Sequence, residues 1–204
     1  AGRALSGSFE AQMNGGAPLR GTMVPTERGT AIRLTAANAG ALLRDSGIFA
    51  NARDGTLELV LMPAAERGQF DGRLSIGRVR LRSSQGIAAL LDAVSVVGLL
   101  DELQGPGIMF ETVDAAFRLT PDVIVLREAA AVGASLGISM DGIYEIASRR
   151  MDMQGVISPV YILNGIGQFL TRPGEGLFGF AYRMTGPPGV TRVEVNPLSI
   201  LTPG

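Results

Sequence analysis

The sequence contains no histidine, cysteine or tryptophan, and all 18 of its basic residues are arginine, so lysine is absent as well. Without histidine and cysteine, the usual zinc sites, cysteine nucleophiles and Ser–His–Asp triads are excluded. Without lysine, a Walker P-loop, a Schiff base and a Ser–Lys dyad are excluded too. Carboxylates are the catalytic groups that remain, and we predict neither a cofactor nor a metal site.

Excess charge and long apolar runs are also missing. The 204 residues carry a formal net charge of −1, and a nucleic-acid-binding protein needs a basic face, so we predict no nucleic-acid partner. The longest apolar run, residues 87–100, is interrupted by Asp92 and is shorter than the roughly 20 residues that span a bilayer. The sequence starts at Ala1 without methionine. We interpret it as a piece of a longer protein, and any membrane anchor must lie outside it.

The residues that are present favour a β protein with a sizeable core. Hydrophobic residues make up 46% of the chain, whereas 28 glycines and 11 prolines separate short apolar runs. Such punctuation is typical of many strands joined by turns. No shift in composition divides the chain, so we predict a single domain over residues 1–204.

Strands are predicted wherever apolar and polar residues alternate. The clearest alternation covers residues 136–146, and further stripes occupy 57–61, 151–157, 178–184 and 193–195. In residues 107–120 the apolar parity switches midway, which predicts a bulge or a twist. The predicted fold is mainly β with short helices. It is a strongly curved antiparallel sheet that forms an apolar groove (taco-like or half-barrel), and its helices cap or fill one end.

Three segments are predicted to be helical. Residues 37–46 have Asn38 as a candidate N-cap, residues 86–103 carry apolar residues at helical spacing with a break near Gly98, and residues 159–170 begin with Pro159. A unit of strand, short helix, glycine and strand recurs at 33–55 and 80–107, with a fainter copy at 161–176.

Sequence patterns that suggest catalysis are better explained without it. The G-x-S-x-G pattern at 133–137 has no histidine base, and the G-x-G-x-x-G pattern at 174–179 has the helix before it and the strand after it. Asp141 and Glu145 lie on one strand face about 13 Å apart at ~3.3 Å per residue, beyond the ~6.5–9.5 Å of inverting glycosidases. With Asp152, they are expected to form part of a solvated face. We therefore predict no catalytic residue and no enzymatic activity.

Two groups of residues are candidates for binding. An apolar sheet face that its helices do not cover is a binding surface, and its predicted lining is Leu136, Ile138, Met140, Tyr144, Phe178 and Phe180. Parity alone does not decide which stripe faces the groove. Arg78, Arg80 and Arg82 are expected to continue the face of Leu74 and Ile76. There they contact anionic head groups or form a solvent face that blocks aggregation.

Several segments are similar to a known family. These are residues 158–164 (SPVYILN), 174–186 (GEGLFGFAYRMTG) and 193–204 (VEVNPLSILTPG), together with 37–43 and 133–142. They resemble the AsmA-like C-terminal domain of the YhdP and AsmA-like envelope proteins of diderm bacteria. The ending Val-Asn-Pro-Leu-Ser is the most specific part of the resemblance, which extends from about Arg20 to Gly204.

The resemblance implies a function without catalysis. It implies the periplasmic part of a protein anchored in the inner membrane, with a β-sheet groove that carries phospholipid acyl chains between the inner and outer membranes and supports outer-membrane lipid homeostasis. Phospholipid is then the expected partner, and membrane contact is made by other parts of the full-length protein. The alternative is a structural module that caps the bridge and docks on an outer-membrane or other envelope protein without binding lipid.

Overall fold

The computed structural model describes residues 5–14, 16–47, 49–82, 85–93, 97–159, 179–187 and 190–196. Its strands are β1 (Gly7–Gln12), β2 (Pro18–Thr26), β3 (Gly29–Ala36), β4 (Ala52–Arg53), β5 (Thr56–Pro63), β6 (Phe70–Leu81), β7 (Ile108–Leu119), β8 (Val123–Gly133), β9 (Leu136–Glu145), β10 (Arg150–Pro159), β11 (Phe180–Gly186) and β12 (Arg192–Asn196). Its helices are α1 (Ala39–Asp45), α2 (Gln85–Ala93) and α3 (Val97–Gln104).

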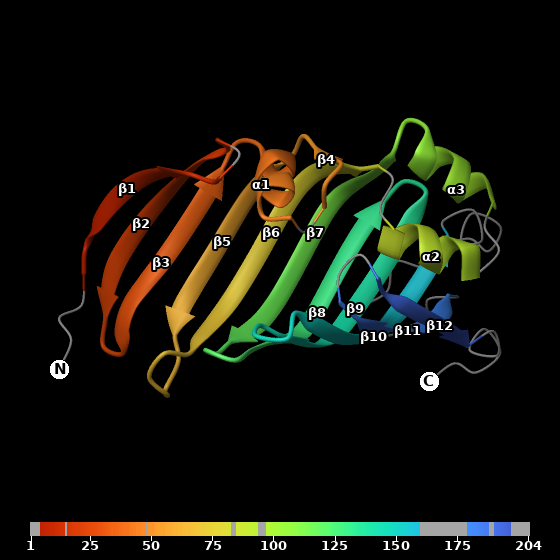
Figure 1. The fold of residues 1–204 in the computed structure, drawn as a ribbon. Helices are drawn as coiled ribbons and strands as arrows, with labels where there is room; N and C mark the ends of the chain where they lie inside the picture. The colour runs from red at the N-terminus through yellow and green to blue at the C-terminus, as the bar shows by residue number, and fades with distance from the viewer. Residues whose placement is uncertain are drawn as a thin grey trace, which may run out of the picture.

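The strands form one 12-stranded sheet with the order β1-β2-β3-β5-β6-β7-β8-β9-β10-β11-β12, and the short β4 pairs with β6 (Figure 1). Every neighbouring pair is antiparallel. The sheet is open, with β1 and β12 as its edges. The predicted fold class, a mainly β protein with short helices and a curved antiparallel sheet, is confirmed.

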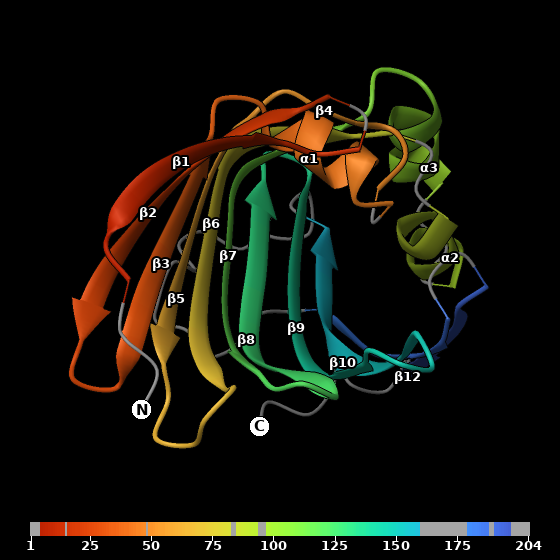
Figure 2. The same ribbon diagram turned by 60° about the vertical axis from the view of Figure 1, so that its left-hand side comes forward.

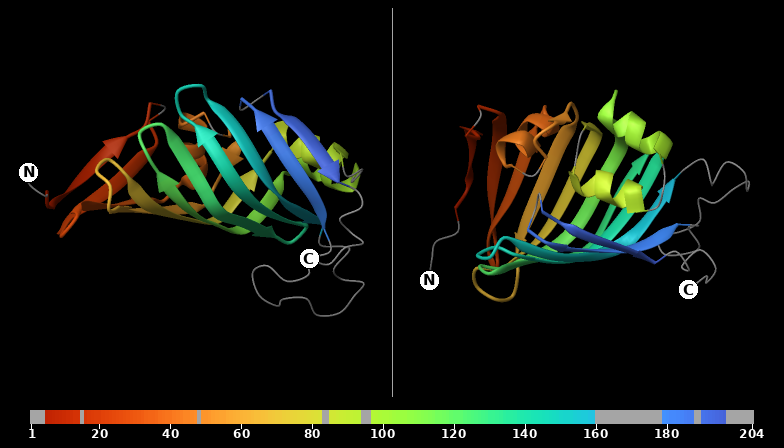
Figure 3. Two further views of the ribbon diagram at one scale, coloured as in Figure 1. Left: turned by 90° about the horizontal axis from the view of Figure 1, so that it is seen from below. Right: turned by 45° about the vertical axis from the view of Figure 1, so that its right-hand side comes forward.

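The sheet bends toward the side on which the helices lie (Figures 2 and 3). Helix α2 follows β6 in the chain yet packs against β12, which is six strands away in the sheet. In a flat sheet that separation is about 29 Å at ~4.8 Å per strand. Contact between them therefore requires a strongly curved sheet, and we call the side that carries the helices the concave face and the opposite side the outer face.

The helices lie at one end of the sheet because of the connections in which they occur. Helix α1 joins β3 to β5, and α2 with α3 joins β6 to β7, so both connections replace a hairpin turn at the same end of neighbouring strands. The other end has short turns. This arrangement confirms the predicted recurrence of strand, helix and strand for its first two copies. The third falls largely on residues 160–178, outside the described residues.

The helix predictions have three outcomes. Asn38 caps α1, because its side-chain oxygen accepts a hydrogen bond from the backbone N–H of Ala41 at 2.9 Å. The segment 86–103 is helical but divided, as predicted, into α2 and α3. The prediction that Pro159 begins a helix is wrong, because this residue ends β10 opposite Leu136, and the rest of that predicted helix lies outside the described residues. Proline is tolerated there because a strand terminus does not need its missing N–H.

Irregularities in β6 and β7 set which side chains face inward. The bulge predicted for β7 is confirmed, because its pairing with β8 shifts between Phe110 and Thr112. Strand β6 has a second irregularity: Arg78 adopts φ 54°, and the ladder passes from Gly77 directly to Val79. The prediction that Arg78, Arg80 and Arg82 continue the face of Leu74 and Ile76 is therefore wrong. The extra residue turns Val79 inward and Arg80 outward.

The hydrophobic core lies beneath the helices. Leu90 and Leu91 of α2 and Leu103 of α3 pack into one cluster with the ends of β6, β7, β9, β10 and β11. The largest fully buried side chains belong to Phe110, Leu90, Leu91, Leu103, Ile108, Leu136, Ile157 and Val79. This end of the concave face is therefore closed.

Candidate functional site

One cross-strand row of apolar residues runs over the concave face from one edge of the sheet to the other. The registers of neighbouring strands place its members directly opposite one another. From β1 to β12 they are Phe9, Gly21, Leu34, Leu59, Leu74, Ala115, Ala129, Met140, Gly155, Tyr182 and Val195. The row contains no charged side chain.

A second row lies beside the first and has the same character. Its members are Gly7, Met23, Ile32, Leu61, Gly72, Phe117, Leu126, Gly142, Met153, Met184 and Val193. Because side chains alternate between the faces of a sheet, both rows project from the concave face. The concave face is thus apolar across the whole width of the sheet.

The outer face carries charged side chains, together with some exposed apolar ones such as Met62 and Ile143. The outward-facing row that flanks the first apolar row, on the side away from the second, begins with Glu10, Arg20, Thr35, Glu58, Ser75 and Asp114. Ion pairs lie along this face, for example Arg33 with Glu58 at 2.9 Å and Arg183 with Asp152 at 2.6 Å. The two faces therefore differ sharply, as expected when one is solvated and the other is covered.

The helices cover the concave face unevenly. Their main contacts are between α1 and β4 and β6, between α2 and β12, and between α3 and β7. Away from them lie partly exposed apolar side chains that are not members of the core cluster. We call the following six the open apolar surface: Met23, Ile32, Leu34, Leu59, Leu61 and Phe117.

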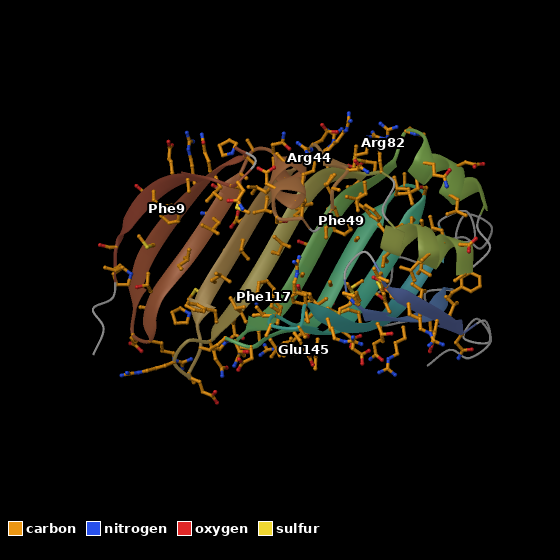
Figure 4. All side chains as sticks on the ribbon, in the orientation of Figure 1. Phe9, Arg44, Phe49, Arg82, Phe117 and Glu145 are labelled. Carbon is orange, nitrogen blue, oxygen red and sulfur yellow. The ribbon has the colours of Figure 1, made fainter. Side chains whose placement is uncertain are left out.

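Two glycines on the concave face lie beneath aromatic rings. A Cβ atom built on Gly21 would lie 2.1 Å from the ring of Phe9, and one built on Gly72 would lie 2.2 Å from the ring of Phe117. Figure 4 marks Phe9 toward the β1 edge of the sheet and Phe117 farther toward its middle. Each ring therefore rests flat on its neighbouring strand, which leaves a broad apolar surface of low relief.

Of the lining residues predicted from sequence, those in the described part of the chain lie on the concave face, but at its covered end. Leu136 is fully buried in the core, so it does not contact a ligand on the open part. Ile138, Met140, Tyr144 and Phe180 are partly exposed and pack against the core cluster. Phe178 lies outside the described residues. The open apolar surface consists of other residues, in β2, β3, β5 and β7.

Tyr182 is the polar exception within the first apolar row. Its side chain is buried, and its hydroxyl donates a hydrogen bond to the backbone carbonyl of Ser139 at 2.9 Å. Burial, and then the nearby charge of Asp141, raises the pKa of the Tyr182 hydroxyl well above its usual value near 10. The hydroxyl therefore stays protonated and keeps this row uncharged.

Replacing Tyr182 with phenylalanine is expected to lower the free energy of unfolding by about 1 kcal/mol, the typical contribution of one hydrogen bond. Because the pKa of Tyr182 is raised in the folded state, its contribution is complete below pH ~10 and is lost as the pH rises above that value. Urea unfolding at pH 7 and pH 10.5 measures both effects. Tyr144→Phe is the control. A loss for Tyr144→Phe as large as that for Tyr182→Phe would contradict the assignment.

The carboxylates considered for catalysis lie on the outer face. Asp141 accepts a hydrogen bond from the side chain of Gln154 at 3.1 Å, and Glu145, marked at the sheet margin in Figure 4, accepts one from Ser148 at 2.7 Å. The hydrogen bond from Arg183 is the main cause that lowers the pKa of Asp152. Within the described residues, no group of three or more carboxylates is arranged to hold a metal ion.

The outer face also carries a hollow of about 1060 Å³, lined by residues that include Glu10, Arg20, Thr35 and Glu58. The ion pair between Arg20 and Glu10, at 2.9 Å, lies along its wall. Such a charged and open surface does not suit an acyl chain. The apolar concave face therefore remains the better candidate site.

Comparisons with known proteins add no identification. The chain matches no protein-family model, and neither the curated proteins nor the solved structures include a significant match to it. The likeness to AsmA-like proteins therefore depends on the sequence segments alone. None of the helices in the described part of the chain is long and apolar enough to cross a bilayer.

Proposed function

We propose that this chain is a non-catalytic module that binds phospholipid acyl chains on its open apolar surface. In this proposal it belongs to the periplasmic part of an AsmA-like protein anchored in the inner membrane, and it takes part in phospholipid transport between the two membranes. The observation that carries the proposal is the pair of apolar rows across the sheet, six members of which form the open apolar surface outside the core cluster.

The chemistry of this surface suits a hydrocarbon chain. Acyl chains need no hydrogen bonds, and burying them stabilises the complex by about 25 cal/mol per Å². An exposed apolar surface of low relief offers many similar shallow contacts in place of one deep pocket. Methionines on the same face, such as Met23 and Met140, are flexible and adapt to chains of different shape. Such a surface allows a chain to bind and to move on.

The proposal is tested by photo-crosslinking. A photoreactive amino acid is placed at Leu34, on the open apolar surface, or at Thr35, the next residue of β3 and on the outer face. The protein is irradiated in cell envelopes and purified, and attached lipids are identified by mass spectrometry. Crosslinks to phospholipid are expected at position 34. At position 35 the yield of such crosslinks is expected not to exceed the background. Equal yields at both positions would mean that the apolar face is not the lipid path.

A second candidate function, docking on an envelope protein without lipid binding, is favoured by the closed end of the concave face. There α2 and α3 bury Leu91, Leu103 and Phe110 completely, which leaves no path for a chain beneath them. In the same experiment, crosslinks from position 34 to protein with no attached lipid would favour docking over lipid binding.

A further inference from the structure

Strands β4 and β6 bring two arginines directly opposite each other. Arg53 pairs with Arg80 in the antiparallel ladder, beside the inward-facing pair of Ala52 and Leu81. Because Ala52 is buried in the core, alternation directs both arginines to the outer face. Like charges directly opposite in a ladder are destabilising, so this pair is unfavourable to the fold taken alone.

A third arginine lies against the same pair. A Cβ atom built on Gly107 would lie 2.4 Å from Cγ of Arg82 and 3.1 Å from Cγ of Arg80, so the stems of both side chains pass over this glycine. Gly107 also has φ 90°, which a residue with a side chain rarely adopts. The glycine thus makes room for the aliphatic stems of two neighbouring arginines.

Two sets of backbone contacts hold the cluster in place. Arg80 donates hydrogen bonds to the carbonyl of Gly107 at 3.2 Å and to that of Pro106 at 3.5 Å. Arg44 of α1 donates to the carbonyl of Ala52, the residue before Arg53. Figure 4 shows Arg44 and Arg82 along the same rim of the sheet. We call Arg44, Arg53, Arg80 and Arg82 the arginine cluster.

Carboxylates do not neutralise the arginine cluster. Within the described residues, none of its four members has a carboxylate oxygen within 4.0 Å. The nearby Glu111 is paired instead with Arg78, at 3.9 Å. Elsewhere on the outer face, Arg20 forms an ion pair with Glu10 and Arg33 forms one with Glu58, each at 2.9 Å. The cluster is therefore a concentration of guanidinium groups that lacks anions of its own.

We propose that the arginine cluster is a binding site for a phosphate group. Guanidinium groups bind phosphate oxygens through paired hydrogen bonds, and several around one anion remove the repulsion between Arg53 and Arg80. The phosphate belongs to a lipid head group at a membrane surface or to a free phosphate compound. Arg53, Arg80 and Arg82 project from the outer face, and Arg44 reaches the same rim of the sheet from α1. Because three of its four members lie on the outer face, the cluster is separate from the open apolar surface.

The test compares two double variants with the same change in charge. In Arg53→Gln with Arg80→Gln the cluster loses its central pair, whereas Arg20→Gln with Arg33→Gln removes two arginines that have glutamate partners. Sodium phosphate is titrated calorimetrically at low salt to probe free phosphate. Flotation with vesicles of phosphatidylcholine, with and without 30% phosphatidylglycerol, probes head groups.

The wild-type protein is expected to bind at least one of the two probes. For that probe, the affinity of the cluster variant is expected to fall at least tenfold, whereas the affinity of the control variant falls less than twofold. Binding of phosphate alone identifies a free compound, and binding of phosphatidylglycerol vesicles alone identifies a lipid head group. The melting temperature of the cluster variant is expected to equal or exceed that of the wild type, because the repulsion is gone. Binding of neither probe, or equal losses in both variants, overturns the proposal.

Discussion

Changing Leu59 and Leu61 together to glutamate is expected to remove most lipid binding while the protein stays folded. Both side chains belong to the open apolar surface and are partly exposed, so the new carboxylates keep much of their hydration. A lipid tail that passes over them loses contact with about four methylene groups. At ~0.8 kcal/mol each, that is about 3 kcal/mol, or a loss of roughly 100-fold in affinity.

The matched control is the double change of Val60 and Met62 to glutamate in the same strand. It adds the same charge at the alternate positions of β5, which face outward, and Met62 is 46% exposed. Phospholipid retained by each purified protein is quantified by mass spectrometry, and urea unfolding reports stability. We expect lipid loss only for the concave-face variant, with stability losses of less than about 2 kcal/mol in both. Retention of wild-type lipid by the concave-face variant would refute the proposed surface.

The largest loss of stability is expected for Phe110→Ala. Phe110 is 1% exposed and lies in the core cluster, where β7 pairs with Val79 of β6 and with Gly133 of β8. Removing a buried phenylalanine ring leaves a cavity that neighbouring side chains fill only partly, at a cost of about 3–5 kcal/mol. That is a large fraction of the ~5–15 kcal/mol by which most domains are stable.

Phe9→Ala is the control, because Phe9 lies on the same face but is 36% exposed. We expect Phe9→Ala to lower the free energy of unfolding by about 1 kcal/mol. Urea unfolding measures this loss, and the dependence of the unfolding free energy on urea concentration is expected to match that of the wild type. Where Phe110→Ala remains folded, its lipid content per folded molecule is expected to match that of the wild type. Equal destabilisation by the two changes would show that the covered end does not dominate stability.

Much of the sheet follows from local pattern. The alternation of Ile138 and Met140 with Ser139 and Asp141 predicted β9 and its inward face, and the structure has both. The parity switch near Phe110 predicted the β7 bulge. These predictions hold because a strand directs successive side chains to opposite faces, so a single sequence segment contains the information. The same is true of Asn38, whose capping bond spans three residues.

The candidate site was only partly predictable. The stripe of Leu57, Leu59 and Leu61 was visible in the sequence, but nothing local indicated that α1 and α2 cover other parts of the face and leave Leu59 and Leu61 open. The predicted lining began instead with Leu136, which is fully buried. Coverage depends on contacts between distant segments, such as that between α2 and β12, which no alternation pattern contains.

The sequence alone excluded histidine, cysteine and lysine chemistry and separated apolar from polar strand faces, because both depend on residue type and spacing. The tertiary structure decided which parts of those faces are covered and which are open. The extra residue Arg78 reversed the parity of β6, and the β4–β6 pairing set Arg53 opposite Arg80, residues 27 positions apart in sequence. Register and curvature arise from hydrogen bonds and packing between remote segments. For that reason the open apolar surface and the arginine cluster became visible only in the folded chain.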